Sequence, residues 1–148
     1  MATLLTIGYE KLLPGALVAE LEHAGAQRLI DVRFRPQSRR AGMSKTRLGE
    51  LLGEHGIAYE HRRELGTPAD LRWLFKNRRV AEGREAFRAH MHGEPGQEAL
   101  DRLAAEVADA DGPLTALMCL EAEPHECHRR VLAEELALRL PALEVVDL

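Results

Sequence analysis

The sequence predicts an α/β fold: a single three-layer domain with a mostly parallel sheet of about five strands flanked by helices. Short apolar runs alternate with longer segments of helical periodicity. Residues 114–120 are almost continuously apolar, as in a strand that is buried on both faces. The chain has 148 residues and no repeat, low-complexity tract or linker, so we expect one domain over residues 1–148.

The first half of the chain predicts three strands and two helices. Gly8 ends the first apolar run, and Pro14 is suited to the first turn of a helix. Ser44 is a residue type that caps helix N-termini. The expected elements are strands at 3–8, 28–33 and 57–60, and helices from Pro14 to about Gly25 and from Ser44 to Gly56.

The second half predicts a helical insertion followed by a regular alternation of helix and strand. The expected elements are the insertion at 68–92, a helix from Pro95 to about Gly112, a strand at 114–120, a helix from about Cys127 to Leu140 and a strand at 144–146. In a mostly parallel sheet, right-handed crossovers then place helices on both faces.

Charge is segregated along the chain. Residues 28–90 carry 15 Lys and Arg against 8 Asp and Glu, a net charge of +7, whereas the remaining residues carry 5 against 16, a net charge of -11. A basic face attracts phosphates or nucleic acid. The net charge of -4 nevertheless argues against strong nonspecific binding to DNA.

The sequence predicts a cytoplasmic protein with no membrane partner. No segment approaches the roughly 18 consecutive apolar residues of a membrane span. Residues 1–20 lack the long apolar core and cleavage site of a signal peptide. The two cysteines stand eight positions apart beside a histidine, unlike a secreted disulfide framework, so we expect both thiols to be reduced.

Polar side chains end or follow four of the expected strands. They are Tyr9 after the first strand, Asp31 and Arg33 at the end of the second, His61 after the third, and Cys119 and Glu121 at the end of the fourth. Because the carboxyl ends of parallel strands share one edge of a sheet, these side chains predict a catalytic or binding crevice there. Loops at strand ends are polar in any case.

Asp31 lies in an apolar strand, where an unpaired carboxylate is costly, so it needs a cation such as Arg33 or Arg39. A structural ion pair and a catalytic base are both consistent with this position. Segment 33–40 carries four guanidiniums around Pro36. This segment is either a phosphate clamp or a solvated loop.

Cys127 lies near an expected helix N-terminus, where the helix dipole and the positive charge of His128 and Arg129 favour a thiolate nucleophile. Cys119 is either a second reactive thiol or a buried inert one. A third interpretation joins both cysteines and His125 or His128 to one metal ion. Their spacing matches no established zinc pattern, and glycine-rich phosphate loops are absent, so we predict no metal, nucleotide or other cofactor.

Blocks of residues in the same order along the chain resemble the family known only as domain of unknown function 488. The blocks are Thr6-Ile7-Gly8-Tyr9-Glu10, Asp31-Val32-Arg33 with Pro36 and Ser38-Arg39, Gly42-Met43-Ser44-Lys45, Tyr59 with His61 and Leu65-Gly66, and Cys119-Leu120-Glu121 with Pro124 and Cys127-His128-Arg129. The resemblance implies a small α/β protein whose activity is unsettled. It favours the interpretation that these blocks form one site.

Our leading hypothesis is a cysteine-dependent transferase or hydrolase that acts on a phosphate-bearing substrate, a nucleotide or nucleic acid. The expected catalytic residues are Cys119, Glu121, Cys127, His128 and Asp31. The expected substrate-binding residues are Tyr9, Arg33, Ser38, Arg39, Lys45, His61 and Arg129.

Two alternatives remain open. In the first, the chain is a nonenzymatic nucleic-acid-binding module that uses the basic central region. In the second, the cysteine-histidine block is structural: Arg129 pairs with Glu121, and Cys119 and Cys127 fill space.

Overall fold

The structure, a computed structural model, describes residues 2–148 and contains every element that the sequence predicts. Its strands are β1 (Thr3–Gly8), β2 (Arg28–Asp31), β3 (Ala58–His61), β4 (Thr115–Cys119) and β5 (Glu144–Asp147). Its α-helices are α1 (Pro14–His23), α2 (Lys45–Glu54), α3 (Ala69–Lys76), α4 (Val80–Met91), α5 (Glu94–Ala108) and α6 (His128–Arg139). Two 3₁₀ turns lie at Arg63–Leu65 and Pro124–Glu126.

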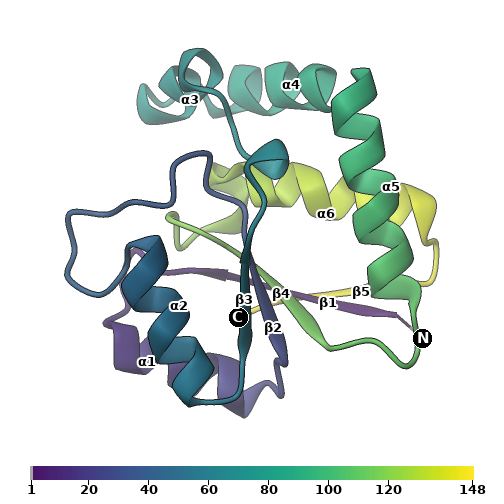
Figure 1. Cartoon of the computed structure of the whole chain (residues 1–148). Coiled ribbons are helices and arrows are strands. Elements are labelled where there is room, and N and C mark those ends of the chain that lie inside the picture. Colours follow the sequence, from purple (N-terminus) through teal and green to yellow (C-terminus); the bar gives the residue numbers. More distant parts are fainter. Residues whose placement is uncertain (1) are drawn as a thin grey trace.

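The predicted α/β architecture is confirmed. All strands pair in parallel, in the order β3-β2-β4-β1-β5, and helices lie on both sides of the sheet (Figure 1). The predicted insertion between β3 and β4 consists of α3 and α4. Within residues 2–148, no helix combines the length and apolar character that crossing a membrane requires.

Each face of the sheet has its own hydrophobic core because successive side chains of a strand point to opposite faces. In β2, Leu29 packs in the core with α1 and α2, whereas Ile30 packs in the core with α5 and α6. The central strand β4 is buried along its whole length, as its continuous apolar run predicts. In β4, Met118 faces α1 and α2, and Cys119 faces α5 and α6.

The chain reverses its direction across the sheet after β3. The connections from β1 through β2 to β3 run over the face of α1 and α2, and those from β3 through β4 to β5 run over the opposite face (Figure 1). β4 therefore lies between two strands whose outgoing connections leave to the other side. Ligands of open α/β sheets bind beyond the carboxyl ends of the strands at such a switch point.

Most helix boundaries follow the predicted signals, although α5 ends at Ala108, before the predicted Gly112. Pro14 opens α1, and Gly25 and Gly56 adopt positive φ just after α1 and α2. Ser44 precedes α2, but its hydroxyl accepts the Ser38 N–H at 3.0 Å and makes no capping hydrogen bond to the helix. Ser44 thus stands at the predicted N-cap position, but the loop before α2 takes up its hydroxyl.

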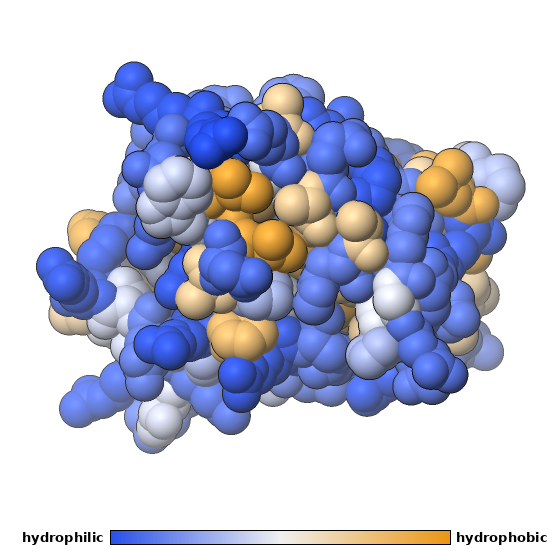
Figure 2. Space-filling model, turned by 90° about the horizontal axis from the view of Figure 1, so that it is seen from above, coloured by the Kyte–Doolittle hydropathy of each residue, from blue (hydrophilic) through white to orange (hydrophobic). Residues whose placement is uncertain are grey.

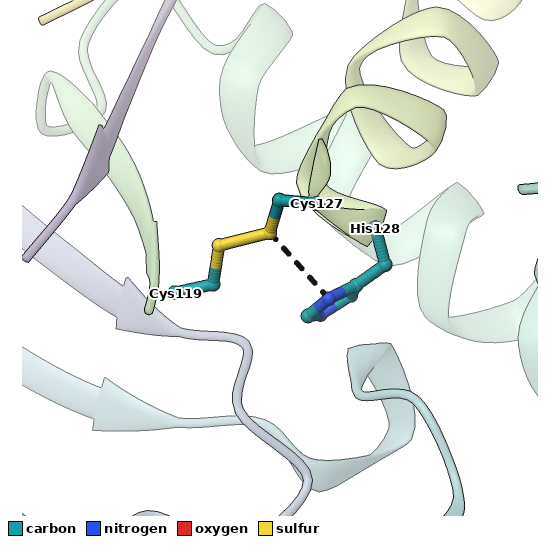
Figure 3. Close-up of side chains that lie close together, drawn as sticks. All are labelled: Cys119, Cys127 and His128. Atoms are coloured by element: carbon teal, nitrogen blue, oxygen red, sulfur yellow. Dashed lines mark hydrogen bonds between the residues drawn. A yellow bond between two sulfur atoms is a disulfide. The ribbon is translucent and has the colours of Figure 1, made fainter. Parts of the chain in front are cut away.

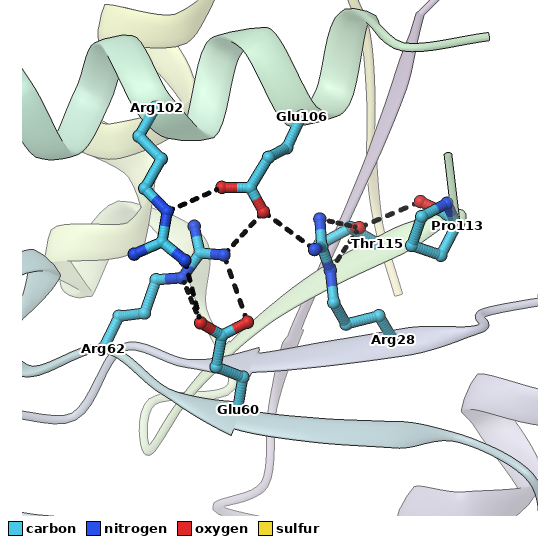
Figure 4. A network of polar contacts seen from close by, with 7 residues as sticks. All are labelled: Arg28, Glu60, Arg62, Arg102, Glu106, Pro113 and Thr115. Atoms are coloured by element: carbon cyan, nitrogen blue, oxygen red, sulfur yellow. Dashed lines mark hydrogen bonds and ion pairs between the residues drawn. The ribbon is translucent and has the colours of Figure 1, made fainter. Parts of the chain in front are cut away.

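A polar network ties α5 to the sheet (Figure 4). The buried guanidinium of Arg62 donates to Glu60 at 3.0 Å and to Glu106 of α5 at 2.6 Å. Glu106 also accepts from Arg28 at 2.8 Å. Burial alone raises the pKa of Glu106, but its contacts with Arg62 and Arg28 prevail and lower it. The ionised carboxylate therefore stabilises the folded state.

We predict that Glu106→Gln lowers the free energy of unfolding by about 1–2 kcal/mol at neutral pH, because Arg62 keeps its buried charge and loses an anionic partner. The cost shrinks as the pH falls through the lowered pKa of Glu106, because the wild-type carboxylate then becomes neutral as well. Urea unfolding at several pH values measures both effects. Glu98→Gln, an exposed change on the same helix, is the control; equal effects of the two changes contradict the assignment.

Candidate functional site

Eight of the twelve predicted site residues gather at the carboxyl ends of the strands, in two clusters on opposite faces of the sheet, and Tyr59, which was not predicted, joins one of them. The Asp31 cluster, on the side of α1 and α2, consists of Tyr9, Asp31, Arg33 and Tyr59. The Cys119 cluster, on the side of α5 and α6, consists of Cys119, Glu121, Cys127, His128 and Arg129. The alternation of side chains along the strands causes this division.

Asp31 is fully buried and saturated with donors. Its carboxylate accepts the backbone N–H of Arg33 at 3.1 Å and the guanidinium through Nε at 2.9 Å and Nη2 at 2.7 Å. The Tyr59 hydroxyl donates to it at 2.5 Å. Of the two cations predicted as partners of Asp31, the structure selects Arg33.

The same contacts hold Arg33 in the interior. Its Nη1 donates to the Met43 carbonyl at 2.8 Å and to the Tyr9 hydroxyl at 3.3 Å. Burial lowers the pKa of Arg33, but the hydrogen bonds and charge of Asp31 prevail and raise it. Burial and the negative charge of Asp31 both raise the pKa of Tyr59. The cluster is therefore a satisfied ion pair that fixes the loop after β2.

The remaining cations of the loop between β2 and α2, where a phosphate clamp was predicted, are of two kinds: one is bound to backbone carbonyls and the others are exposed. Arg40 donates to the Tyr9 carbonyl at 2.6 Å and to the Glu10 carbonyl at 2.8 Å, so it joins this loop to the end of β1. Arg39 and Lys45 are exposed. The sequence singled out Arg39 for the site and missed the structural roles of Arg40 and Tyr59.

Ser38 and His61 have backbone partners. The Ser38 hydroxyl accepts the Arg40 N–H at 3.1 Å, within the loop before α2. The His61 Nε2 lies 2.7 Å from the Arg33 carbonyl, which can only accept, so Nε2 carries the proton. His61 thus stabilises the backbone at Arg33, and Ser38 stabilises the loop before α2.

Cys119 and Cys127 form a disulfide in this structure, with their sulfurs 2.10 Å apart (Figure 3). The expectation that both thiols are reduced is therefore wrong for this structure. Cys119 ends β4 and Cys127 is the N-cap of α6, so packing α6 against the sheet brings together two residues that are eight positions apart in the sequence. Each cysteine is 1 % exposed.

His128 directs a ring nitrogen at this pair. Its Nε2 lies 2.9 Å from the Val32 carbonyl and must donate to it, which leaves the Nδ1 lone pair facing Cys127 Sγ at 3.7 Å (Figure 3). Burial lowers the pKa of His128 to about 4. The imidazole is therefore neutral at neutral pH, and its Nδ1 is a free acceptor or ligand.

Arg129 is a fully buried cation that binds the loop between the cysteines. Its guanidinium donates to Cys119 Sγ at 3.1 Å and to the carbonyls of Glu121 and Ala122. Its backbone N–H donates to Cys127 Sγ at 3.5 Å. One residue thus supplies a donor to each sulfur, and such donors favour thiolate over thiol when the disulfide is reduced.

Glu121 places a carboxylate beside the first sulfur, with Oε2 3.5 Å from Cys119 Sγ. Burial raises the pKa of this carboxyl. The structural alternative predicts that Arg129 pairs with Glu121. In the structure, Arg129 donates to the backbone carbonyl of Glu121 and not to its carboxylate. The carboxylate is therefore not part of that hydrogen bond.

A surface hollow of about 680 Å³ lies at the same end of the sheet. Phe34, Arg63, Gly66, Pro68, His90 and Pro95 line it. Seen from above, an apolar area lies among hydrophilic side chains on this end of the molecule (Figure 2). The volume is in the range of small-molecule sites. Arg63, whose guanidinium lies 4.2 Å from the centre of the Phe34 ring, was not among the predicted site residues.

The geometry also brings together the donors of one of the predicted metal sets. Both cysteine sulfurs and a ring nitrogen of His128 lie within 4.8 Å of one another, and all three residues are buried. His125, the alternative histidine, is exposed.

A family model with the description "Domain of unknown function DUF488" matches residues 15–136. The chain belongs to the DUF488 family. The predicted resemblance is confirmed, and the whole Cys119 cluster lies inside the matched range. Neither a curated protein nor a solved structure matches this DUF488 chain. Because the family description assigns no activity, the chemistry of the site has to be inferred from its geometry.

We predict that Asp31→Asn lowers the free energy of unfolding of this DUF488 protein by about 3 kcal/mol or more, because it leaves the Arg33 guanidinium buried without its counter-charge. Tyr59→Phe removes one donor and costs about 1 kcal/mol. Chemical denaturation of both variants measures the difference. If Asp31→Asn is as stable as Tyr59→Phe, the ion pair does not organise this end of the sheet.

Proposed function

We propose that this DUF488 protein is a cysteine-dependent enzyme, a transferase or hydrolase, that acts on a phosphate-bearing substrate at the Cys119 cluster. One observation carries the proposal: at the switch point of the sheet, Cys127 Sγ lies at a helix N-terminus between a backbone N–H at 3.5 Å and the unprotonated Nδ1 of His128 at 3.7 Å. In this proposal Cys127 is the nucleophile, His128 is its base and the Val32 carbonyl orients that base.

The proposed reaction begins once a cellular thiol has reduced the disulfide to two thiols and has itself been oxidised. The Sγ–H proton of Cys127 passes to Nδ1 of His128 as Sγ attacks the electrophilic centre of the substrate. The leaving group then takes that proton as its bond to the substrate breaks, and the remaining group stays bonded to Sγ. Water or an acceptor hydroxyl next gives its proton to Nδ1 and attacks this group. The bond to Sγ breaks, and the proton returns from Nδ1 to Sγ. The Val32 carbonyl holds the imidazole in the tautomer that this transfer needs.

Cations at this end of the sheet fall into two groups, of which only the second is assigned to an anionic substrate. Arg33 and Arg129 are bonded internally, so in this proposal they position the loops and do not hold the substrate. Arg39 and Lys45 are exposed, and Arg63 lines the hollow at the same end of the sheet. We assign the phosphate to these three cations. Asp31 is a positioning residue, because its oxygens accept from Arg33 and Tyr59.

The nucleic-acid-binding alternative loses part of its basis when the chain folds. Four cations of the basic region pair with acidic side chains from the acidic C-terminal region: Arg28 and Arg62 with Glu106, and Arg84 and Arg88 with Glu134. The opposite charges of the two regions therefore form ion pairs with each other inside the folded chain. For this reason we favour the enzyme.

We predict that, after reduction and in the presence of a chelator, iodoacetamide labels Cys127 at neutral pH at least about 10-fold faster than it labels a free thiol such as N-acetylcysteine. Peptide mass spectrometry assigns the labelled position. The oxidised protein should not be labelled.

His128→Gln and His125→Gln form the matched pair for this experiment. The first removes the proposed base, and the second changes an exposed histidine of the same loop. We expect slower labelling of Cys127 only in His128→Gln, with no loss of folded structure by circular dichroism. If Cys127 reacts no faster than the free thiol in the folded, reduced protein, the nucleophile is rejected.

A further inference from the structure

We propose that the reduced protein binds one soft divalent cation, with Zn²⁺ as the probe, through Cys119 Sγ, Cys127 Sγ and the Nδ1 of His128. This inference goes beyond the proposed function: it assigns the same residues a second, metal-bound state. Thiolate and imidazole are the ligands that zinc prefers, and two cysteines with one histidine form a three-ligand set that leaves one coordination position open.

Two distances between prospective ligand atoms match a tetrahedral site. With Zn–S near 2.3 Å and Zn–N or Zn–O near 2.0–2.2 Å, a sulfur and a nitrogen or oxygen on one zinc lie about 3.6 Å apart. Cys127 Sγ and His128 Nδ1 are 3.7 Å apart, and Cys119 Sγ and Glu121 Oε2 are 3.5 Å apart. Glu121 is therefore a candidate for the fourth position.

The backbone also has room for a metal between the sulfurs. The Cα atoms of Cys119 and Cys127 are 7.4 Å apart, beyond the roughly 4.4–6.8 Å that most disulfides span. Two sulfurs on one zinc lie about 3.8 Å apart. Opening the disulfide thus lets both sulfurs reach a metal while the ends of β4 and α6 stay in place.

Hydrogen bonds hold each of the three prospective ligands, as they do around metal ligands in known metal sites. A metal-bound histidine almost always donates its other ring N–H to a carbonyl or carboxylate, and His128 donates Nε2–H to the Val32 carbonyl at 2.9 Å. Arg129 donates to Cys119 Sγ at 3.1 Å and to Cys127 Sγ at 3.5 Å. Each of the three ligands therefore already has an orienting partner.

The charges balance when the metal is bound. Two thiolates, one divalent cation, the guanidinium of Arg129 and the carboxylate of Glu121 sum to zero. Binding releases the two thiol protons to solvent. A metal-free pair of thiolates at the same place leaves a net negative charge among buried residues, which is costly.

The experiment starts from the full chain, reduced with a phosphine, freed of metal with a chelator and then exchanged into chelator-free buffer. Co²⁺ and Zn²⁺ are titrated separately. We expect one Co²⁺ per chain, with thiolate-to-metal charge transfer and the intense visible bands of tetrahedral coordination. Zn²⁺ should displace Co²⁺ and raise the Tm. The oxidised protein should bind neither ion, because its sulfurs carry no free thiolate.

Four variants locate the site. Cys127→Ser and His128→Gln should abolish stoichiometric binding, Glu121→Gln should weaken it by about 10-fold or more, and His125→Gln should leave it unchanged. Circular dichroism of each metal-free variant checks folding. If Cys127→Ser does not fold, loss of the Co²⁺ absorption bands in folded His128→Gln, with the bands retained in His125→Gln, decides whether the imidazole is a ligand.

The metal assignment is overturned if the folded, reduced wild-type protein binds less than one Co²⁺ per chain, or if His128→Gln binds as well as the wild type. The proposed nucleophile is tested separately by alkylation in chelator. Fast alkylation without metal binding leaves the enzyme proposal standing and removes this one. If the protein binds metal but Cys127 is alkylated slowly in the presence of chelator, the metal site stands and the enzyme proposal is removed.

Discussion

The buried guanidinium of Arg129 is the contact on which the candidate site depends. It joins the start of α6 to the end of β4 by donating to Cys119 Sγ and to the carbonyls of Glu121 and Ala122. Those carbonyls lie in the partly buried loop between β4 and α6, outside the pairing of the strands, and a carbonyl shielded from water without a donor is costly. Because one planar group serves three acceptors, the loop can bring Cys127 back to Cys119.

Gly8, at the end of the neighbouring strand β1, makes this close approach possible. A Cβ atom at this position would lie 1.7 Å from the Glu121 carbonyl oxygen and 2.9 Å from Arg129 Nη1. Only a residue without a side chain leaves space for both groups. The glycine that ends an apolar run in the sequence is thus required by tertiary packing as well as by the end of the strand.

The fold was predictable from the sequence because its signals are local. The apolar run of β4, the proline that opens α1 and the glycines after α1 and α2 each specify an element without reference to distant residues. The polar strand ends were predictable for the same reason: parallel strands place their carboxyl ends at one edge. The periodicity of the apolar residues therefore predicted most of the architecture.

The internal arrangement of the site was not predictable in the same way. Whether Arg39 or Arg40 turns inward depends on where the carbonyls after β1 lie, and adjacent residues of the same type give no sign of this. The disulfide depends on the packing of α6 against β4, and an eight-residue spacing does not reveal it. The division into two clusters follows from which face each strand end presents, and that requires the topology of the whole sheet.

The two clusters are nevertheless coupled through two consecutive carbonyls after β2. His128 of the Cys119 cluster donates to the Val32 carbonyl, and His61 donates to the carbonyl of Arg33, whose side chain is bound by Asp31. The Asp31 ion pair fixes this stretch of backbone from one face of the sheet, and the stretch in turn sets the tautomer and direction of His128 on the other. A buried charge pair without a reactive group of its own thus determines which nitrogen faces the sulfurs. A satisfied carboxylate in an apolar strand thus helps to position a candidate site that lies on the opposite face of the sheet.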